Sequence, residues 1–360
     1  MKICLFNTIK PWGGGENWHF CTAKALQAND FEVIVAADKN GALWQHAIAE
    51  DLQVKHFAVA NLSFFNPFKR RAIRNWFVRE KFDAVIFNSP KELKVAVDAA
   101  VYAKISRIIY RRGSAIPIKN SLRNRRTFKK LTDIIANSEA TKKTILQNNP
   151  NLFPANKIAV IYNGIDTHTF EQKERVQNPV PIIGNLGRCV HQKGQDMLLQ
   201  AIFKLKQRGV ACRCVIGGDG PLLSNLKAMA AQLDIADYVD FIGFVNDPKQ
   251  FLQSIDIFVL PSRWEGFGYV IAEVMANAKP VVAFDISSNP ELIEHQQTGI
   301  LIPFADIDLL ANTIETLVNN PTLRETFGQK GKEVAIQKFN NKQNENKLID
   351  FLKTTPSHSF

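Results

Sequence analysis

Short apolar runs recur along this chain, and each is followed by a stretch in which apolar residues return every three or four positions. An apolar run of four to six residues predicts a buried strand, and the longer period predicts an amphipathic helix. Strands are predicted in the first half at residues 2–7, 31–36, 54–59, 84–88, 106–110 and 133–137. This alternation of strands and helices indicates a doubly wound parallel sheet.

The second half repeats the pattern after a polar segment. A strand at residues 158–166 closes the first half, and the Pro-containing stretch 171–181 is predicted to be a linker. Further strands are predicted to begin near residues 181, 215, 239, 256, 280 and 298. A chain of 360 residues is too long to fold around a single hydrophobic core of usual size, so two α/β domains are expected. We place them at residues 1–170 and 178–335, followed by a C-terminal helix at 336–360.

The composition of the chain restricts the cellular compartment in which the protein is expected. The sequence has no apolar run of 18 residues, which predicts no spanning helix, and its N-terminal apolar run is too short for a signal peptide. The five cysteines are odd in number and lack the spacing of metal ligands; they are Cys4, Cys21, Cys189, Cys212 and Cys214. Buried reduced thiols are expected, which favours a cytoplasmic protein.

The net charge of +11 is unevenly distributed. Residues 1–168 carry 26 Lys and Arg against 13 Asp and Glu, whereas residues 169–360 carry 19 against 21. Two basic clusters, residues 64–81 and 119–130, dominate, and the first interleaves cations with aromatic rings. This composition suits an anionic membrane surface on the inner face of the cytoplasmic membrane, or an anionic acceptor. The alternative is a solvated helix face. Nucleic acid is not expected, because no motif for it is present.

The stretch Pro261–Val282 carries the most specific chemistry. An apolar strand is followed by a turn with Gly266 and Gly268 and then by a helix. The N-terminus of such a helix offers unpaired N–H groups to an anion. Glu265 and Glu273 bracket it, and carboxylates suit pairs of sugar hydroxyls. The stretch therefore predicts a ligand with both phosphate and sugar; the alternative is an ordinary strand–helix unit with surface glutamates.

A second loop provides cations. Arg188 and Lys193 lie five residues apart in a glycine turn between a strand and the helix that starts at Gln195. Arg as a planar fork and Lys as a point charge suit a diphosphate. The alternative is a pair of surface cations.

These motifs resemble those of retaining GT-B glycosyltransferases of family 4. Glu265 to Glu273 is similar to the E-x7-E signature, Gly187 to Gly194 to the G-R-x-x-x-x-K-G loop, and Gly218 to Leu222 to G-x-G-P-L. The resemblance implies two Rossmann-like domains facing a central cleft, with the C-terminal helix crossing back to the first. It also implies donor contacts, which fall on Gly14, Gly15, Arg188, Lys193, Gly266, Phe267, Gly268 and Glu273.

The resemblance further implies the roles of individual residues. Arg188 and Lys193 would hold the diphosphate, Glu265 the hydroxyls of the donor sugar and Glu273 the ribose diol. Glu265, Arg188 and Lys193 are thus the candidate catalytic residues. No metal and no cofactor are implied, because the cations neutralise the leaving group and no D-x-D pair lies in a suitable loop.

The chain departs from the family at two places. Many members carry a His after the strand that is predicted here at residues 106–110, where this chain has Arg111 and Arg112, so we name no catalytic base. With Glu16, these arginines are the candidate acceptor-binding residues. The stretch Ser287–Glu291 replaces the commoner G-G-x-x-E loop, and Ser there narrows the freedom of the backbone.

The expected function is transfer of a sugar from a nucleoside-diphosphate sugar to a hydroxyl of a lipid-linked glycan, in lipopolysaccharide, O-antigen or capsule synthesis. UDP is favoured by family frequency alone. One alternative is the same fold acting on a soluble sugar, and another is a sugar-nucleotide-binding protein without activity. A dehydrogenase fits less well, since Gly13–Gly15 lacks G-x-G-x-x-G spacing.

Overall fold

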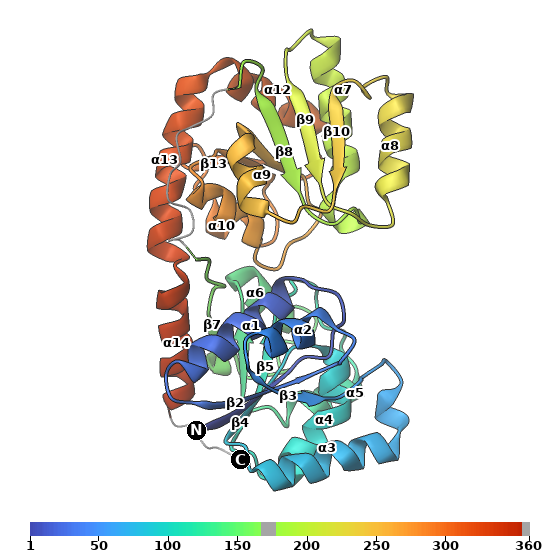
Figure 1. The fold of residues 1–360 in the computed structure, drawn as a ribbon, viewed down its shortest axis with the longest axis vertical. Coiled ribbons are helices and arrows are strands. Elements are labelled where there is room, and N and C mark those ends of the chain that lie inside the picture. The colour runs from blue at the N-terminus through green and yellow to red at the C-terminus, as the bar shows by residue number, and fades with distance from the viewer. Residues whose placement is uncertain (167–177, 355–360) are drawn as a thin grey trace. The chain divides into compact units, whose positions relative to one another are not determined.

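The computed structural model describes residues 1–166 and 178–354. The chain forms two compact units, Met1–Asn163 with the segment from Lys342 onward, and Gly164–Asn341 (Figure 1). The predicted boundary at residue 170 and most of the predicted linker at 171–181 lie outside the described residues. Each unit is built on one parallel sheet with helices on both faces.

The first unit has a seven-stranded sheet in the order β3-β2-β1-β4-β5-β6-β7. Its strands are β1 Lys2–Phe6, β2 Glu32–Ala37, β3 Gln53–His56, β4 Ala84–Phe87, β5 Arg107–Arg112, β6 Asp133–Ala136 and β7 Ile158–Val160. All the strands predicted here are present. β5 is longer than predicted because Arg111 and Arg112 still pair with β6.

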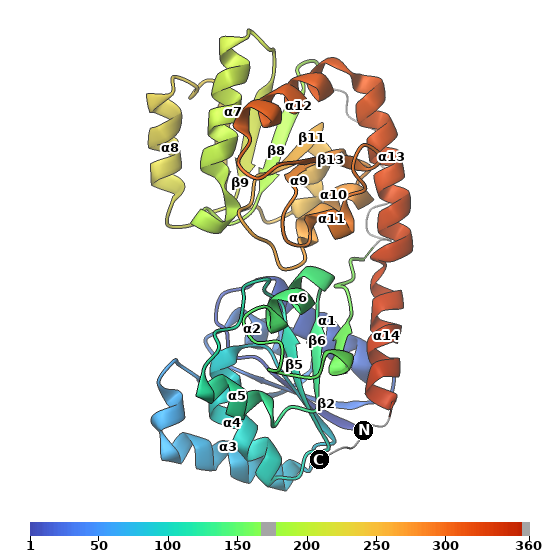
Figure 2. The same cartoon turned by 180° about the vertical axis from the view of Figure 1, so that it is seen from behind.

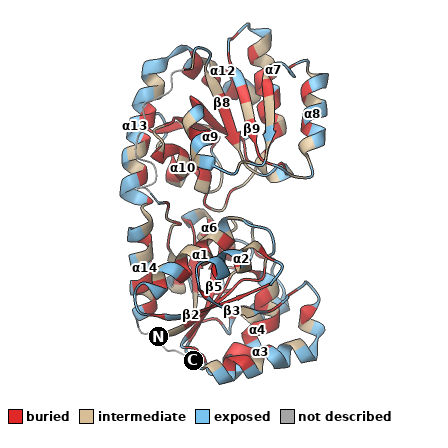
Figure 3. Ribbon diagram, in the orientation of Figure 1, coloured by how far each residue is buried: buried red, intermediate tan, exposed pale blue. Residues whose placement is uncertain are grey.

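Helices cover both faces of this sheet (Figure 2). They are α1 Gly14–Gln27, α2 Ala42–Ala49, α3 Pro67–Glu80, α4 Pro90–Tyr102, α5 Leu122–Phe128, α6 Glu139–Leu146 and α14 Asn341–Lys353. Side chains alternate across each strand, so Cys4 packs with α3 and α4 on one face, while Ile3 and Leu5 pack with α1, α2 and α14 on the other. The core lies in these two layers (Figure 3).

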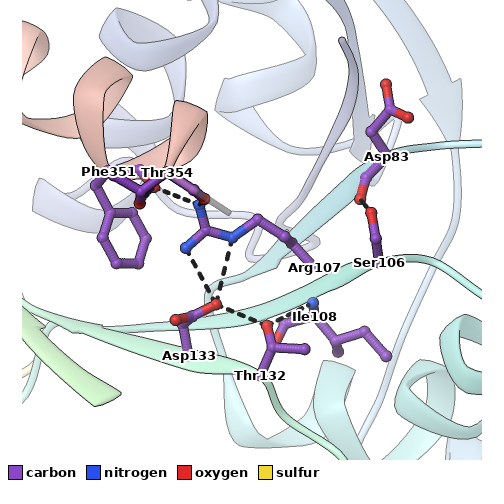
Figure 4. Close-up of polar contacts among 8 residues, drawn as sticks. All are labelled: Asp83, Ser106, Arg107, Ile108, Thr132, Asp133, Phe351 and Thr354. Atoms are coloured by element: carbon purple, nitrogen blue, oxygen red, sulfur yellow. Dashed lines mark hydrogen bonds and ion pairs between the residues drawn. The ribbon is translucent and has the colours of Figure 1, made fainter. Parts of the chain in front are cut away.

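The last helix belongs to the first unit, as predicted. Leu348, Ile349 and Leu352 of α14 join the apolar layer against α1 and α2. Arg107, at the start of β5, donates to the backbone carbonyl of Phe351 and also bonds Asp133 (Figure 4). The helix starts at Asn341 rather than at the expected 336.

The second unit has a six-stranded parallel sheet in the order β10-β9-β8-β11-β12-β13. Its strands are β8 Ile182–Leu186, β9 Arg213–Gly217, β10 Val239–Gly243, β11 Ile257–Leu260, β12 Val281–Phe284 and β13 Gly299–Ile302. Its helices are α7 Gln195–Gln207, α8 Leu223–Gln232, α9 Pro248–Ser254, α10 Tyr269–Ala276, α11 Asn289–Leu292, α12 Ile307–Asn319 and α13 Pro321–Lys338. The predicted α/β class is confirmed in both units.

The segments that enter and leave the second unit lie side by side. Ile165 N donates to Phe339 O at 2.8 Å, and Asn341 N donates to Ile165 O at 2.9 Å. A Cβ on Gly164 would lie 2.4 Å from Asn341 Cα, so only glycine fits there. The second unit is therefore inserted into the first by two adjacent segments.

Two expectations from composition can be compared with the structure. No helix within residues 1–166 and 178–354 is long and apolar enough to cross a bilayer. All five cysteines are free, and four of them are buried. Burial raises the pKa of Cys212 to about 11, so its thiol stays protonated at neutral pH.

Candidate functional site

Three loops at the carboxyl ends of β8, β9 and β11 interlock through glycines. Gly194 has a φ of +66°, and a Cβ there would lie 1.9 Å from Pro261 O. Gly218 has a φ of +137°, and its Cβ would lie 2.0 Å from Gly187 O. The positive φ and the close approach both require glycine. The loop that carries Arg188 and Lys193 is thus fixed against both of its neighbours.

Lys193 and Glu265 meet across two of these loops. Lys193 Nζ lies 2.7 Å from Glu265 Oε1, and Ser262 Oγ donates to the same oxygen at 2.7 Å. Glu265 is 5% exposed, so the pair is largely shielded from water. Arg188 is exposed, and its guanidinium has no ion pair within the described residues. The structure therefore brings two of the predicted catalytic residues together and leaves the third accessible.

A second ion pair holds the same loops in place. Arg263 donates to Asp196 through both terminal nitrogens, at 2.9 and 2.6 Å, and to His191 O at 2.9 Å. Gln192 Nε2 donates to Trp264 O at 3.0 Å. These residues lie beside the predicted motifs, but sequence analysis did not single out Arg263 or Asp196. The two are 67 residues apart in sequence, so no local spacing reveals them.

The helix α10 begins at Tyr269, directly after Gly268. Gly268 has a φ of +81° and is the N-cap residue, and the N-terminus of a helix attracts anions. The Phe267 side chain is 2% exposed and packs edge-on against Tyr269 and Phe339, with ring centroids 5.5 and 5.6 Å apart. The side chain of Phe267 is therefore not accessible to a ligand.

Glu273 lies in the second turn of α10 and is half-buried. Desolvation raises the pKa of its carboxyl to about 7. Its carboxylate makes no hydrogen bond or ion pair within the described part of the chain. A desolvated carboxylate without a partner can accept two hydroxyl donors at little cost of rearrangement.

The serine-rich loop after β12 keeps the backbone conformation that glycine would favour. Ser287 has a φ of +48°. Asn289 Nδ2 donates to Phe284 O at 2.9 Å, whereas Asn289 Oδ1 and Ser288 Oγ are buried and find no hydrogen-bond partner among the described residues. A Cβ on Gly268 would lie 3.9 Å from Asn289 Oδ1, so this loop borders the start of α10.

In the first unit, Glu16 and Arg111 belong to one polar network. Asn7 Nδ2 donates to Glu16 Oε1 at 3.1 Å and Asn88 Nδ2 donates to the same atom at 3.4 Å. Arg111 donates to Asn163 Oδ1 at 2.9 Å and to Asn88 Oδ1 at 3.5 Å. Asn88 thus connects the two candidates. Sequence analysis did not single out Asn7, Asn88 and Asn163, although each lies at or near the end of a predicted strand, at 2–7, 84–88 and 158–166.

Gly14 and Gly15 form the first turn of α1, beside this network. A Cβ on Gly15 would lie 2.8 Å from Asn88 Nδ2. Gly15 O is 2.9 Å from Nδ1 of the fully buried His19. Desolvation, aided by the charge of Arg111, lowers the pKa of His19 to about 3, so this ring is neutral. His19 is therefore a structural residue.

Arg112 lies on the other face of β5. Neighbouring residues in a strand point to opposite faces, so Arg111 and Arg112 cannot reach the same side. Arg112 donates to Tyr110 OH at 3.1 Å and to Ile116 O at 2.5 Å. The structure does not bring Arg112 into the network of Glu16 and Arg111; it holds the loop after β5.

Among residues 1–166 and 178–354, no group of three His, Cys, Asp or Glu side chains could hold a metal ion. The polar groups of the site are instead cations and carboxylates on loops tied to one another.

Comparison with known proteins places the chain in a family. Residues 12–169 match the model described as Glycosyltransferase Family 4, and residues 166–334 match the model described as Glycosyl transferases group 1. The two ranges follow each other and together cover most of the chain. The protein thus belongs to the GT-B glycosyltransferases of family 4, and the resemblance drawn from its motifs is confirmed.

Curated relatives cover this chain to different extents. The capsular polysaccharide biosynthesis glycosyltransferase CapM of Staphylococcus aureus is 31% identical over 58% of this chain and 58% of its own length. The first curated relatives that the chain matches are covered over only about half of their length. The lipopolysaccharide core biosynthesis glycosyltransferase LpsE of Rhizobium meliloti is 25% identical over 99% of this chain and 100% of its own.

A solved structure supports the fold over the full chain. The Anabaena protein HepE, in complex with UDP and glucose, superposes with a TM-score of 0.85 and is 22% identical; the match covers 98% of this chain and 100% of that one. At that identity the likeness shows the GT-B fold alone.

Proposed function

We propose that the protein transfers a sugar, with retention of anomeric configuration, from a nucleoside-diphosphate sugar to a hydroxyl of a lipid-linked glycan. The observation that carries this proposal is the pairing of Lys193 with Glu265, fixed by Ser262 and by loops that interlock through glycines. The cation would bind the phosphate and the carboxylate would bind hydroxyls of the sugar, so the pair matches both parts of a sugar phosphate.

The proposed mechanism depends on stabilising the charge of the leaving group. As the bond between the sugar and the phosphate breaks, negative charge builds up on the diphosphate. Arg188, Lys193 and the N-terminus of α10 would stabilise that charge, and such electrostatic stabilisation supplies most of the rate enhancement in many enzymes. The departing phosphate oxygen takes the proton of the incoming hydroxyl on the same face of the sugar, so no separate base is needed. The reaction proposed here proceeds without a metal ion.

The two glutamates would orient the donor. Glu265 accepts hydrogen bonds from hydroxyls of the donor sugar, and Glu273 accepts them from the ribose diol. Backbone groups of Gly266, Phe267 and Gly268 would line the phosphates. Gly14 and Gly15 are the candidate donor-binding residues of the first unit. Glu16 and Arg111 would contact the acceptor. We keep Arg112 out of the acceptor site because it binds Tyr110 and Ile116 instead.

Donor and acceptor are proposed from relatives. HepE was solved with UDP and glucose, which supports UDP as the nucleotide. LpsE and CapM are named for lipopolysaccharide core and capsule synthesis, which supports a glycan acceptor of a bacterial surface. A soluble sugar acceptor is the second candidate function, since no contact in the described residues requires a lipid. A sugar-nucleotide-binding protein without activity is the third.

We further propose that the protein works at the inner face of the cytoplasmic membrane. In the basic clusters 64–81 and 119–130, four large apolar side chains face solvent: Phe65 is 70% exposed, Phe68 82%, Val78 46% and Leu122 72%. Exposed rings beside cations suit an anionic bilayer. Vesicles of phosphatidylglycerol should sediment the protein and vesicles of phosphatidylcholine should not. Equal recovery in both pellets would contradict membrane binding by charge.

The test of the donor site is thermal unfolding with UDP, GDP, ADP and CMP, without added metal. A ligand that binds only the native state raises the melting temperature. One diphosphate should raise it clearly, and Lys193→Ala should abolish the shift. Lys227→Ala, which removes an exposed lysine on α8, is the matched control. If no nucleotide raises the melting temperature, the proposed donor site is wrong.

A further inference from the structure

The first unit contains a large cavity that the proposed reaction does not use. Its volume is about 890 Å³, within the range of roughly 300–1,000 Å³ typical of small-molecule sites. Its walls come from the end of α4, the starts of β5 and β6, and the segment 150–157. The starts of parallel strands lie at the opposite end of the first unit's sheet from Arg111 and the start of α1.

The interior of this cavity is apolar. The lining side chains that are buried in the protein are almost all hydrocarbon: Ile105, Ile108, Phe128, Leu131, Leu152 and Phe153. Such a surface favours an apolar ligand group, because binding removes hydrocarbon from water on both sides.

The accessible part of the lining includes three lysines. Lys104, Lys129 and Lys130 also line the cavity, and all three are exposed. Within the described residues Lys104 and Lys129 have no ion pair, while Lys130 pairs with Asp98. These lysines therefore present positive charge where the cavity meets solvent.

The carboxylate in the wall does not neutralise that charge. Asp133 Oδ2 lies 3.1 Å from Arg107 Nη2 and accepts from Thr132 Oγ1 at 2.8 Å (Figure 4). Because Arg107 already balances Asp133, an anionic ligand would meet the lysines without competition from this carboxylate.

We propose that this cavity binds one apolar chain of an anionic lipid, with the lipid phosphate held by Lys104, Lys129 and Lys130. An apolar interior with a cationic rim matches the two ends of such a molecule. Lys129 and Lys130 also end the basic cluster 119–130, so a lipid in the cavity would lie at the surface proposed to meet the membrane. The site is separate from the donor site and does not depend on glycosyl transfer.

The test uses single-chain probes below their micelle concentration and isothermal titration calorimetry on the full-length protein. Dodecyl phosphate should bind with a defined stoichiometry near one. Dodecyltrimethylammonium, which has the same chain and the opposite charge, and inorganic phosphate, which has no chain, should bind at least tenfold more weakly. If the cationic probe binds as tightly as the anionic one, the proposal is overturned.

Two variants locate the probe. Ala155 is exposed and lines the cavity, so Ala155→Trp should fill it and weaken dodecyl phosphate at least tenfold. The double variant Lys104→Glu and Lys129→Glu should weaken it similarly by charge reversal, whereas Lys227→Glu on α8 should not. Circular dichroism confirms that each variant is folded. Unchanged affinity in both cavity variants would show that the probe binds elsewhere and would refute this site.

Discussion

The carboxyl edges of the two sheets use their polar side chains differently. In the second unit, Arg188 is exposed and Glu273 has no partner within the described residues, so these groups are available to a ligand. In the first unit, Glu16 and Arg111 are 5% and 3% exposed and are tied together through Asn88. The first arrangement suits a common, charged ligand. The arrangement in the first unit suits a ligand that is recognised by its shape, because the polar groups there neutralise and hold one another.

This contrast suggests how the two units divide the work. A diphosphate is recognised by charge, and charge requires few residues at fixed spacing. An acceptor hydroxyl is recognised by position, and position requires a network whose members hold one another. Changes in the second unit should therefore act mainly on donor binding and the chemical step, and changes in the first on the acceptor.

The largest expected effect is that of Lys193→Ala. Removing this cation leaves the leaving diphosphate less stabilised and Glu265 without its partner at 2.7 Å. We expect kcat/KM for the donor to fall by about 10³-fold. Steady-state kinetics of sugar transfer measure this fall, with Lys227→Ala as control. Near-full activity in Lys193→Ala would remove the basis of the site assignment.

Arg111 and Arg112 provide the sharpest test of the contrast, because they are neighbours on opposite faces of β5. Arg111→Lys loses the fork that reaches Asn163 and Asn88, and we expect kcat/KM for the acceptor to fall about 10²-fold while the donor KM stays within about twofold. Arg112→Lys should leave both within about threefold. Equal losses of kcat/KM in the two variants would show that acceptor binding does not depend on which face of β5 carries the arginine.

The next effect concerns pH and Glu273. With a carboxyl pKa of about 7, the free protein holds a proton there at pH 6, and the ribose diol favours the ionised form. Nucleotide binding should therefore release a proton, and affinity should rise up to about tenfold between pH 6 and pH 7.5. Titration calorimetry in two buffers of different ionisation enthalpy counts the protons. Glu273→Gln should bind more weakly and without pH dependence; a retained dependence would point to another group.

The smallest expected effect is on stability in acid, through His19. Its pKa is about 3 in the folded protein and near 6.5 when unfolded, so the unfolded state takes up the proton first. Stability should fall as pH drops below about 6.5. The variant His19→Gln keeps a donor for Gly15 O. Between pH 7 and pH 5 its melting temperature should fall by a few degrees less than that of the unsubstituted protein. A variant with the same acid sensitivity would show that other groups dominate.

Most of the fold could be predicted from the sequence, because buried parallel strands are continuous apolar runs and the turns after them contain glycine. The donor loops were predictable for the same reason, since Gly194 and Gly268 need positive φ and Arg188 and Lys193 keep fixed spacing. The acceptor side was less predictable. Arg111 and Arg112 looked equivalent because the strand was expected to end at Tyr110, and its extension to Arg112 separates them. The Arg263 contact with Asp196 depends on tertiary packing alone.

The insertion of one unit into the other has a consequence for synthesis of the protein. The core of the first unit is completed by α14, yet the 178 residues of Gly164–Asn341 are translated before it. At typical elongation rates this interval is roughly 10–35 s. Throughout it, the apolar side chains that later bury Leu348, Ile349 and Leu352 face solvent or a chaperone. The second unit can fold on the ribosome as soon as it emerges, whereas the first half of the chain, although made earlier, becomes complete last.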